Sequence, residues 1–433
     1  MTSDAAPSNT AGAVTDLVPL LPDELAALLA EAGEPPYRGR QVFAWVHARR
    51  ATSIDAMTDL PKALRAWLGT RCLVSRIEPV EVLSSADGTR KLLFDDGAGG
   101  LYNSVIMPSP DRVTLCISSQ VGCRMACGFC LTGCMRFRRN LTAAEIAGQV
   151  LAAARILDAE GAVPEPAHRE AERIRSGSQE RGAGRSERSW NLRDATVGVP
   201  ATPEPPGGAR RSGTGAGPAP GGPQPGRTRP AHVSNVVFMG MGEPLDNFDE
   251  VVRAVRLITH REGLRVAPRR TTVSTVGLLP EMRRFLEAGT GASLALSLCA
   301  TTDEVRSRVV PASRRYPLDA VVDALRGMPL PHGHSYTIEY QLIPGVGASV
   351  EDARRLSRML SLFPNKVNLI PFNPWPGAPF REPTPAEVEA FRAVLAEKHH
   401  RVTVRWSRGR DIGAACGQLG GGERRGPEGG ETR

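Results

Sequence analysis

The chain has 433 residues, of which 41% are hydrophobic, and its formal net charge at neutral pH is +8. This size predicts two or three domains around a sizeable buried core. No apolar run approaches the roughly 20 residues that a membrane-spanning helix needs, and residues 1–15 lack the basic start and apolar stretch of a secretory signal. We therefore expect a cytoplasmic protein with no membrane partner, and its positive charge would suit a polyanion such as RNA.

The first part of the chain, residues 16–107, is predicted to form a small amino-terminal accessory domain after a disordered tail at residues 1–15. Apolar positions at helical spacing predict three helices, at Asp23–Ala32, Gly39–Arg49 and Leu60–Leu68. Residues 78–107 read as short strands with a turn at Asp87-Gly88. The domain is therefore expected to begin with helices and to end with strands.

Residues 161–230 differ sharply in composition from the rest of the chain. They contain 13 Gly, 11 Pro and 11 Arg, and the seven acidic residues leave this segment with half of the total net charge, 11 − 7 = +4. Such a segment buries too little apolar surface to offset the entropy of ordering it. We predict a disordered insertion here, and a second disordered tail at residues 421–433.

Between residues 108 and 420, strand patterns alternate with helical patterns. The predicted strands are Val113–Ser118, Val233–Met239, Arg270–Thr275, Ala292–Leu298, Tyr336–Ile343 and Lys366–Phe372, with a further candidate at Val402–Trp406. The predicted helices are Leu141–Leu157, Phe248–His260, Leu318–Met328 and Glu351–Leu362, and capping motifs mark two helix starts, at Thr142 and Thr384. Strict alternation implies a parallel sheet, and about six repeats predict an α/β fold of the partial (βα)6 barrel type. Function is then expected at the carboxyl ends of the strands.

The most informative motif follows the first of these strands. Cys123, Cys127 and Cys130 lie at the spacing C-x3-C-x2-C on one short loop. Three thiolates so arranged can hold three irons of a [4Fe-4S] cluster and leave the fourth iron open to a small ligand. The alternatives are a disulfide pair or a tetrahedral zinc site completed by Cys134. Eight cysteines are too few for a disulfide scaffold in a chain of this length, and the position at the catalytic rim favours the open cluster.

Small polar groups follow the later strands. Gly242 and Glu243 come after the second strand, where glycine permits close backbone approach to a ligand and the carboxylate could bind an ammonium group. Further candidates of this kind, singly weak but falling at successive strand ends, are Ser274, Ser297, Leu298, Cys299 and Asn373.

Taken together, the motifs resemble a known family. The cysteine loop, with Phe129 before its third cysteine, resembles that of radical S-adenosylmethionine (SAM) enzymes. Behind it, in order, come Gly-Met-Gly-Glu-Pro-Leu, Val-Ser-Thr-Val-Gly, Asn-Leu-Ile-Pro-Phe-Asn-Pro and Arg-Gly-Arg-Asp-Ile-Gly-Ala-Ala-Cys-Gly-Gln-Leu. This series is similar to the RlmN/Cfr family of RNA adenine methyltransferases, over roughly residues 18–420 apart from the insertion.

The resemblance implies a radical SAM core, a [4Fe-4S] cluster on Cys123, Cys127 and Cys130, and SAM as the second cofactor. It implies SAM contacts by Gly242, Glu243, Ser274, Ser297, Leu298, Cys299 and Asn373. It also implies an amino-terminal domain that contacts RNA, methylation of adenine at C2 in 23S ribosomal RNA with tRNA as a further candidate substrate, an electron donor of the flavodoxin type, and a monomeric enzyme.

In the family's mechanism, Cys416 is the methyl carrier. One SAM methylates its sulfur, and a radical made from a second SAM takes hydrogen from that methyl group, which then adds to adenine. Cys116 would release the methylated RNA by forming a disulfide with Cys416. The indirect route is needed because a ring carbon flanked by nitrogens is too weak a nucleophile to attack SAM.

The chain departs from the family pattern at three positions, Asn103, Cys299 and Cys134, the last of which is not usually cysteine. Asn103 lies thirteen residues before Cys116, where the family usually has a glutamate that removes a proton from the adduct, and an amide cannot act as that base. Asp95, Asp96 or a water would have to replace it, and Cys299 stands where histidine is usual. Two alternatives therefore stay open: a Cfr-like adenine C8 methyltransferase, or an RNA-binding paralogue with altered or lost methyl transfer.

Overall fold

A computed structural model describes residues 14–160, 232–328, 330 and 334–420. The predicted insertion at 161–230, the tail at 421–433 and nearly all of the tail at 1–15 lie outside these residues. Within the described ranges, no helix combines the length and the apolar character needed to cross a membrane.

The chain begins with a helical region that is held together by close helix packing. It contains α1 (Pro22–Ala30), α2 (Tyr37–His47) and α3 (Lys62–Arg71), and the short strands β1 (Thr15–Asp16) and β2 (Cys72–Leu73) pair in parallel. All three predicted helices are confirmed within a few residues. Gly39 of α2 lies against α1 so closely that an added Cβ would sit 2.4 Å from the carbonyl oxygen of Pro22. The contact of α1 with α2 therefore depends on a missing side chain.

One ten-stranded sheet organises the rest of the described chain, in the order β14-β13-β12-β11-β10-β9-β6-β5-β4-β3. Its antiparallel part consists of β3 (Glu81–Ser84), β4 (Arg90–Asp95) and β5 (Leu101–Ser109). Its parallel part consists of β6 (Arg112–Cys116), β9 (Asn235–Phe238), β10 (Thr271–Thr275), β11 (Ser293–Ser297), β12 (Tyr336–Leu342), β13 (Asn365–Pro371) and β14 (Val402–Val404). All seven predicted core strands are present and pair in parallel, as expected for a partial barrel.

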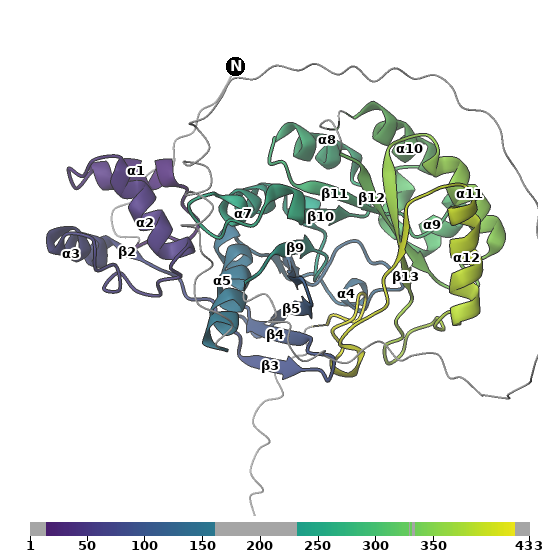
Figure 1. Cartoon of the computed structure of the whole chain (residues 1–433), viewed down its shortest axis with the longest axis horizontal. Helices are drawn as coiled ribbons and strands as arrows, with labels where there is room; N and C mark the ends of the chain where they lie inside the picture. Colours follow the sequence, from purple (N-terminus) through teal and green to yellow (C-terminus); the bar gives the residue numbers. More distant parts are fainter. Residues whose placement is uncertain (1–13, 161–231, 329, 331–333, 421–433) are drawn as a thin grey trace, which may run out of the picture. The chain divides into compact units, whose positions relative to one another are not determined.

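Helices connect the parallel strands. They are α5 (Ala143–Ala159), α7 (Phe248–Thr259), α8 (Leu279–Glu287), α9 (Asp303–Val309), α10 (Leu318–Gly327), α11 (Val350–Leu360) and α12 (Pro385–Glu397), and Figure 1 shows α11 and α12 side by side. Both predicted capping motifs are confirmed: Thr142 and Glu145 cap α5, and Thr384 and Glu387 cap α12. In each box the hydroxyl and the carboxylate satisfy backbone N–H groups that the first helical turn leaves unpaired.

The predicted division between residues 107 and 108 falls inside β5. The strands β3, β4 and β5 continue the same sheet as the parallel strands, because β5 pairs with β6 from Val105–Cys116 to Ser109–Arg112. The helical region before β3 contributes no strand to this sheet, and its β1 and β2 pair with each other.

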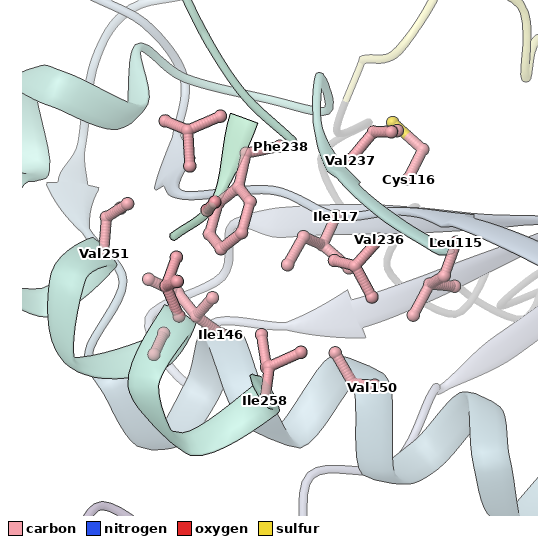
Figure 2. Packing of buried hydrophobic residues seen from close by; sticks show 14 of the residues in the cluster. Leu115, Cys116, Ile117, Ile146, Val150, Val236, Val237, Phe238, Val251 and Ile258 are labelled. Carbon is pink, nitrogen blue, oxygen red and sulfur yellow. The ribbon is translucent and has the colours of Figure 1, made fainter. Parts of the chain in front are cut away.

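The alternation of side chains on β6 and β9 explains where Cys116 points. Leu115 and Val236 are register partners, as are Cys116 and Val237. Figure 2 shows Leu115 and Val236 directed towards α5 and α7, whereas Cys116 and Val237 lie on the opposite side of the strands. The side of the strands that faces the helices is fully buried and apolar. Because side chains alternate along a strand, Cys116 points to the other side, towards the inside of the barrel.

The carboxy-terminal segment after β14 returns to the antiparallel strands. The Arg408 guanidinium donates to the carbonyl of Pro108, Gly409 N donates to Asp87 Oδ2 at 3.0 Å, and Lys91 Nζ donates to Gly413 O at 3.1 Å. These bonds join residues 300 or more positions apart. They bring residues 405–420 to the end of the barrel that carries Cys116.

The close approach at Gly39 predicts a contrast between two helical glycines. Gly39→Ala should lower the free energy of unfolding by about 2 kcal/mol, because the new Cβ would strike backbone atoms of Pro22 and Ala26. Gly69→Ala should raise it by up to about 1 kcal/mol, because an added Cβ there meets no atom within 4 Å and alanine favours the helix. Urea unfolding of the two variants measures both effects, and equal destabilisation would contradict the packing described for α1 and α2.

His47 predicts a pH dependence of stability. Its ring is fully buried, lies tilted against Phe43 with the ring centroids 4.4 Å apart, and contacts Val18 O through Nε2. Burial lowers its pKa from 6.5 to about 4. Between these values the unfolded chain binds a proton that the folded chain does not. The contribution of neutral His47 to the free energy of unfolding is therefore fully present above pH 6.5. It is lost as the pH falls towards 4, and amounts to about 3 kcal/mol in total. Urea unfolding at pH 6.5 and pH 4 measures this effect. Between the two pH values, the free energy of unfolding should fall by about 3 kcal/mol more in wild type than in His47→Gln. His399→Asn, which changes an exposed histidine, should show the same fall as wild type.

Candidate active site

A cavity opens at the carboxyl ends of the parallel strands. It encloses about 820 Å³ of space, counted out to its mouth. Most of the residues singled out from the sequence line it: Cys123, Cys127, Cys130, Gly242, Glu243, Ser274, Ser297 and Cys416. These residues come from five separate segments of the chain, which the barrel topology brings to one edge.

The cysteine loop is held at the cavity by backbone hydrogen bonds at both ends. At its start, Gln120–Val121 (β7) pairs with Arg139–Asn140 (β8), and Gly122 has a φ of +78° with no room for a side chain beside Arg136 O. Further along, Gly128 N donates to Val309 O at 2.9 Å, and Leu131 N donates to Gly417 O at 2.8 Å. The loop is therefore anchored to α9 and to the carboxy-terminal segment.

The three cysteines of this loop are poorly exposed to water. Burial raises the pKa of Cys123 to about 12 and also raises the pKa of Cys127 and Cys130. Bare thiolates would be costly here, so the loop suits thiolates that are neutralised by bound iron.

The arrangement fits a cluster better than a single ion. No three His, Cys, Asp or Glu side chains of the described ranges converge as the ligands of one metal ion would. In a [4Fe-4S] cluster each cysteine binds a different iron, so convergence on one point is not required. Cys134, the fourth ligand of the zinc alternative, is exposed at the end of α4 (Leu131–Cys134) and does not line the cavity.

Glu243 is a buried carboxylate after β9. Its oxygens accept hydrogen bonds from Leu245 N at 3.1 Å and Val276 N at 2.9 Å, and burial raises its pKa to about 7 despite these bonds. The preceding Gly242 has a φ of +102°, and an added Cβ would lie 2.6 Å from Gln120 Cβ. Glycine is therefore required for the turn that brings Glu243 to the cavity.

Ser274 and Ser297 lie at neighbouring strand ends, and their hydroxyls are 3.2 Å apart. The two residues after Ser297 do not line the cavity. Leu298 N donates to Glu339 O at 3.0 Å, and Cys299, with a φ of +62°, packs in the apolar cluster that contains Cys127 and Phe129. Both side chains belong to the wall behind the cavity.

Cys416 and Cys116, 300 residues apart in the sequence, are near enough for one thiol to affect the pKa of the other. Cys416 keeps accessible surface towards the cavity although protein atoms surround it, and its backbone carbonyl accepts a hydrogen bond from Asn373 Nδ2 at 3.0 Å. Burial, and then the neighbouring Cys416, raise the pKa of Cys116. Asn373 therefore contacts the Cys416 loop rather than lining the cavity itself.

Asn103 is fully buried on β5 and binds the carboxy-terminal segment. Its Nδ2 donates to Gly420 O at 3.2 Å, a bond that a carboxylate could not make. Asp95 and Asp96, the candidate replacements for a base at this position, accept hydrogen bonds from the backbone of residues 97–100 and do not line the cavity.

Glu339 and Gln341 are among the lining residues that the motif search missed. Glu339 and Gln341 lie on β12, a strand that is buried along its whole length. Glu339 Oε2 and Gln341 Nε2 are buried and have no hydrogen-bond partner. Polar residues at a spacing of two within a buried strand were the available signal, because such groups are normally paired.

Comparisons with known proteins agree on one family. Residues 15–74 match the family model described as the ribosomal RNA large subunit methyltransferase N-terminal domain. Over 94% of its length the chain is 42% identical to the dual-specificity RNA methyltransferase RlmN of Geobacter sulfurreducens, covering 92% of that protein. The RlmN of Pelobacter propionicus is 40% identical, with 94% of this chain and 96% of that protein covered. The chain belongs to the RlmN family. It is a SAM-dependent RNA methyltransferase of the radical SAM superfamily, as the resemblance of its motifs implied.

A solved structure supports the same assignment. The crystal structure of a radical SAM methyltransferase from Sphaerobacter thermophilus superposes with a TM-score of 0.72 at 37% identity, and covers 94% of this chain and 99% of that one. The predicted α/β radical SAM fold with a small helical amino-terminal domain is confirmed.

The cysteine loop predicts a contrast in iron content. Single changes Cys123→Ala, Cys127→Ala and Cys130→Ala should each reduce bound iron from about four per chain towards zero, because each removes one ligand of the cluster. Cys134→Ala should keep the wild-type value, since Cys134 is exposed outside the cavity. Metal analysis of anaerobically prepared protein measures this. Zinc in place of iron, lost also in Cys134→Ala, would support the four-cysteine site instead.

Proposed function

We propose that this enzyme methylates adenine at C2 in 23S ribosomal RNA, with tRNA as a second substrate, through a methyl group carried on Cys416. The relatives' name, dual-specificity RNA methyltransferase, supports an RNA substrate. One observation carries the mechanistic part: a single cavity is lined by the cysteine loop, the strand-end polar groups and Cys416.

In this proposal Cys123, Cys127 and Cys130 hold the [4Fe-4S] cluster, which when bound would supply the electron that cleaves SAM. The residues proposed to bind SAM are Gly242, Glu243, Ser274, Ser297, Leu298, Cys299 and Asn373. The first four line the cavity, and Glu243 would place a carboxyl group near the ammonium of SAM. A flavodoxin-type protein is the proposed electron donor, and the enzyme is proposed to act as a monomer in the cytoplasm.

The two remaining thiols have different tasks. Cys416 has surface open to the cavity, so its sulfur can accept a methyl group and present it to a base. Cys116 is buried close to Cys416 on the inside of the barrel. We assign Cys116 the release of the product: it forms a disulfide with Cys416 when the bond between Cys416 and the methylated RNA breaks.

Asn103 gives the alternatives a specific basis. Its amide binds Gly420 O, so the proton of the adduct must leave by another group or a water. A Cfr-like enzyme acting at C8, or a paralogue that binds RNA without completing methyl transfer, would differ at this step.

Nucleoside analysis tests the proposal. Wild-type enzyme with SAM, a reductant and unmodified ribosomal RNA or tRNA should produce 2-methyladenosine, measured by mass spectrometry after digestion of the RNA. Cys416→Ala should produce none, because the methyl carrier is gone. The Cys416 peptide of wild type should carry an S-methyl group, which reports the first methyl transfer separately.

Two outcomes would contradict the proposal. Formation of 8-methyladenosine would place the reaction at C8. An S-methylated Cys416 and cleaved SAM without any methyladenosine would support the paralogue that has lost the second transfer.

A further inference from the structure

Glu339 and Gln341 line the same cavity, and each has a buried polar atom without a hydrogen-bond partner, an acceptor on Glu339 and a donor on Gln341. They are two residues apart on β12, so the strand period of two places both side chains on one face. Each side chain is more than nine-tenths buried, and both line the cavity. Buried polar atoms without partners are costly, so two of them side by side in a cavity point to a ligand.

The surroundings of Glu339 fix one of its oxygens and leave the other for that ligand. Asn368 Nδ2 donates to Oε1 at 2.8 Å, whereas Oε2 has no partner. Burial raises the pKa of Glu339, and the cationic Arg405 acts in the opposite direction. Oε1 is therefore held by Asn368, and Oε2 is the carboxyl oxygen that remains for a ligand.

Both side chains lie beside the Cys416 loop. Glu339 and Arg405 are the two charged groups with the strongest effect on the pKa of Cys416, with Glu339 raising it. An added Cβ on Gly417 would lie 4.0 Å from Gln341 Nε2. Any base that receives a methyl group from Cys416 must approach this sulfur to bonding distance, which brings it into the cavity that Glu339 and Gln341 also line.

We propose that Glu339 and Gln341 recognise the Watson–Crick edge of the substrate adenine. The 6-amino group donates to Glu339 Oε2, and N1 accepts a hydrogen bond from Gln341 Nε2. This proposal rests on the proposed function, because it requires an adenine base extruded from RNA into the cavity. It agrees with reaction at C2, since C2 is bonded to N1 and Gln341 is the member of the pair beside the Cys416 loop.

The pair also explains discrimination among bases. Guanine has an acceptor at position 6 and a donor at N1, the reverse of adenine. Its position 6 acceptor would face the acceptor Glu339 Oε2, and its N1 donor would face the donor Gln341 Nε2. A site built to hydrogen-bond a base rejects an analogue that leaves its buried groups unpaired. SAM contains adenine too, and Glu339 is the register partner of Ser297, one of the residues proposed to bind SAM, so the experiment has to separate the two adenines.

Binding measurements with short RNAs test the proposal. The cluster-loaded full chain is saturated with S-adenosylhomocysteine, which fills the SAM site, and titrated with an oligouridine RNA that contains one adenosine or, in its place, purine riboside, which lacks the 6-amino group. Wild type should bind the adenosine RNA about 10-fold more tightly. Glu339→Gln should reduce this preference to less than about 3-fold, because an amide nitrogen or a weaker acceptor replaces the carboxyl oxygen.

A second variant tests the other half of the pair. Wild type should also bind RNA with adenosine more tightly than RNA with 1-deazaadenosine, which lacks N1. Gln341→Leu should lose that preference. RNA with 7-deazaadenosine, which lacks N7, should bind wild type and Gln341→Leu as tightly as RNA with adenosine does. Asp352→Asn is the matched control: Asp352 is a similarly buried carboxylate on α11, but its oxygens are paired with Thr301, Ser349 and Arg355. This variant should keep both preferences.

Several outcomes would overturn the proposal: no preference in wild type, an unchanged preference in Glu339→Gln and Gln341→Leu, or sensitivity to loss of N7 instead of N1. A fall in affinity for S-adenosylhomocysteine that accompanies the change would assign the pair to the SAM adenine instead. Failure of the proposed function is distinguishable, because it would show as absence of methyladenosine in the nucleoside analysis, independently of these affinities.

Discussion

The site depends on the docking of the carboxy-terminal segment against the cysteine loop and the antiparallel strands. Leu131 N and the Thr132 hydroxyl donate to the carbonyls of Gly417 and Leu419, Asn373 holds the carbonyl of Cys416, and Asn103 holds that of Gly420. Each bond satisfies a backbone carbonyl that would otherwise be left unpaired near the cavity. Without this docking, Cys416 would have no defined position relative to Cys116 or to the loop that holds the proposed cluster.

Burial is the second constraint, and it gives the thiols their chemistry. Desolvation raises the pKa of every cysteine that surrounds the cavity, so none of them is a stable thiolate without a partner. Iron would be that partner for the loop cysteines. For Cys116 and Cys416, a raised pKa suits the proposed pair, in which the Cys416 sulfur is methylated and the two sulfurs later form a disulfide.

The sequence was informative wherever one residue type meets a local requirement. Strand periodicity, the capping boxes at Thr142 and Thr384, and the spacing of Cys123, Cys127 and Cys130 are all readable without a structure because each depends on near neighbours. The pairing of β5 with β6 was not readable, since a strand pattern does not state its partner, and the boundary predicted after residue 107 therefore falls within β5. Glu339 and Gln341 carry no motif, and their importance comes from Asn368 on the next strand and from Gly417, which are distant in sequence. Asn103 could be recognised as a departure, but its bond to Gly420 O depends on the fold.

In the proposed mechanism, Cys416 carries the methyl group into a covalent bond with adenine, and Cys116 then releases the methylated RNA. Anaerobic incubation of Cys116→Ala with SAM, reductant and RNA, followed by denaturing electrophoresis and peptide mapping, measures this directly. Cys116→Ala should accumulate an RNA adduct attached at Cys416. The adduct should be absent from the double variant in which Cys416 is also changed to alanine. Free methylated RNA and no adduct from Cys116→Ala, with an intact cluster and a methylated Cys416, would contradict this mechanism.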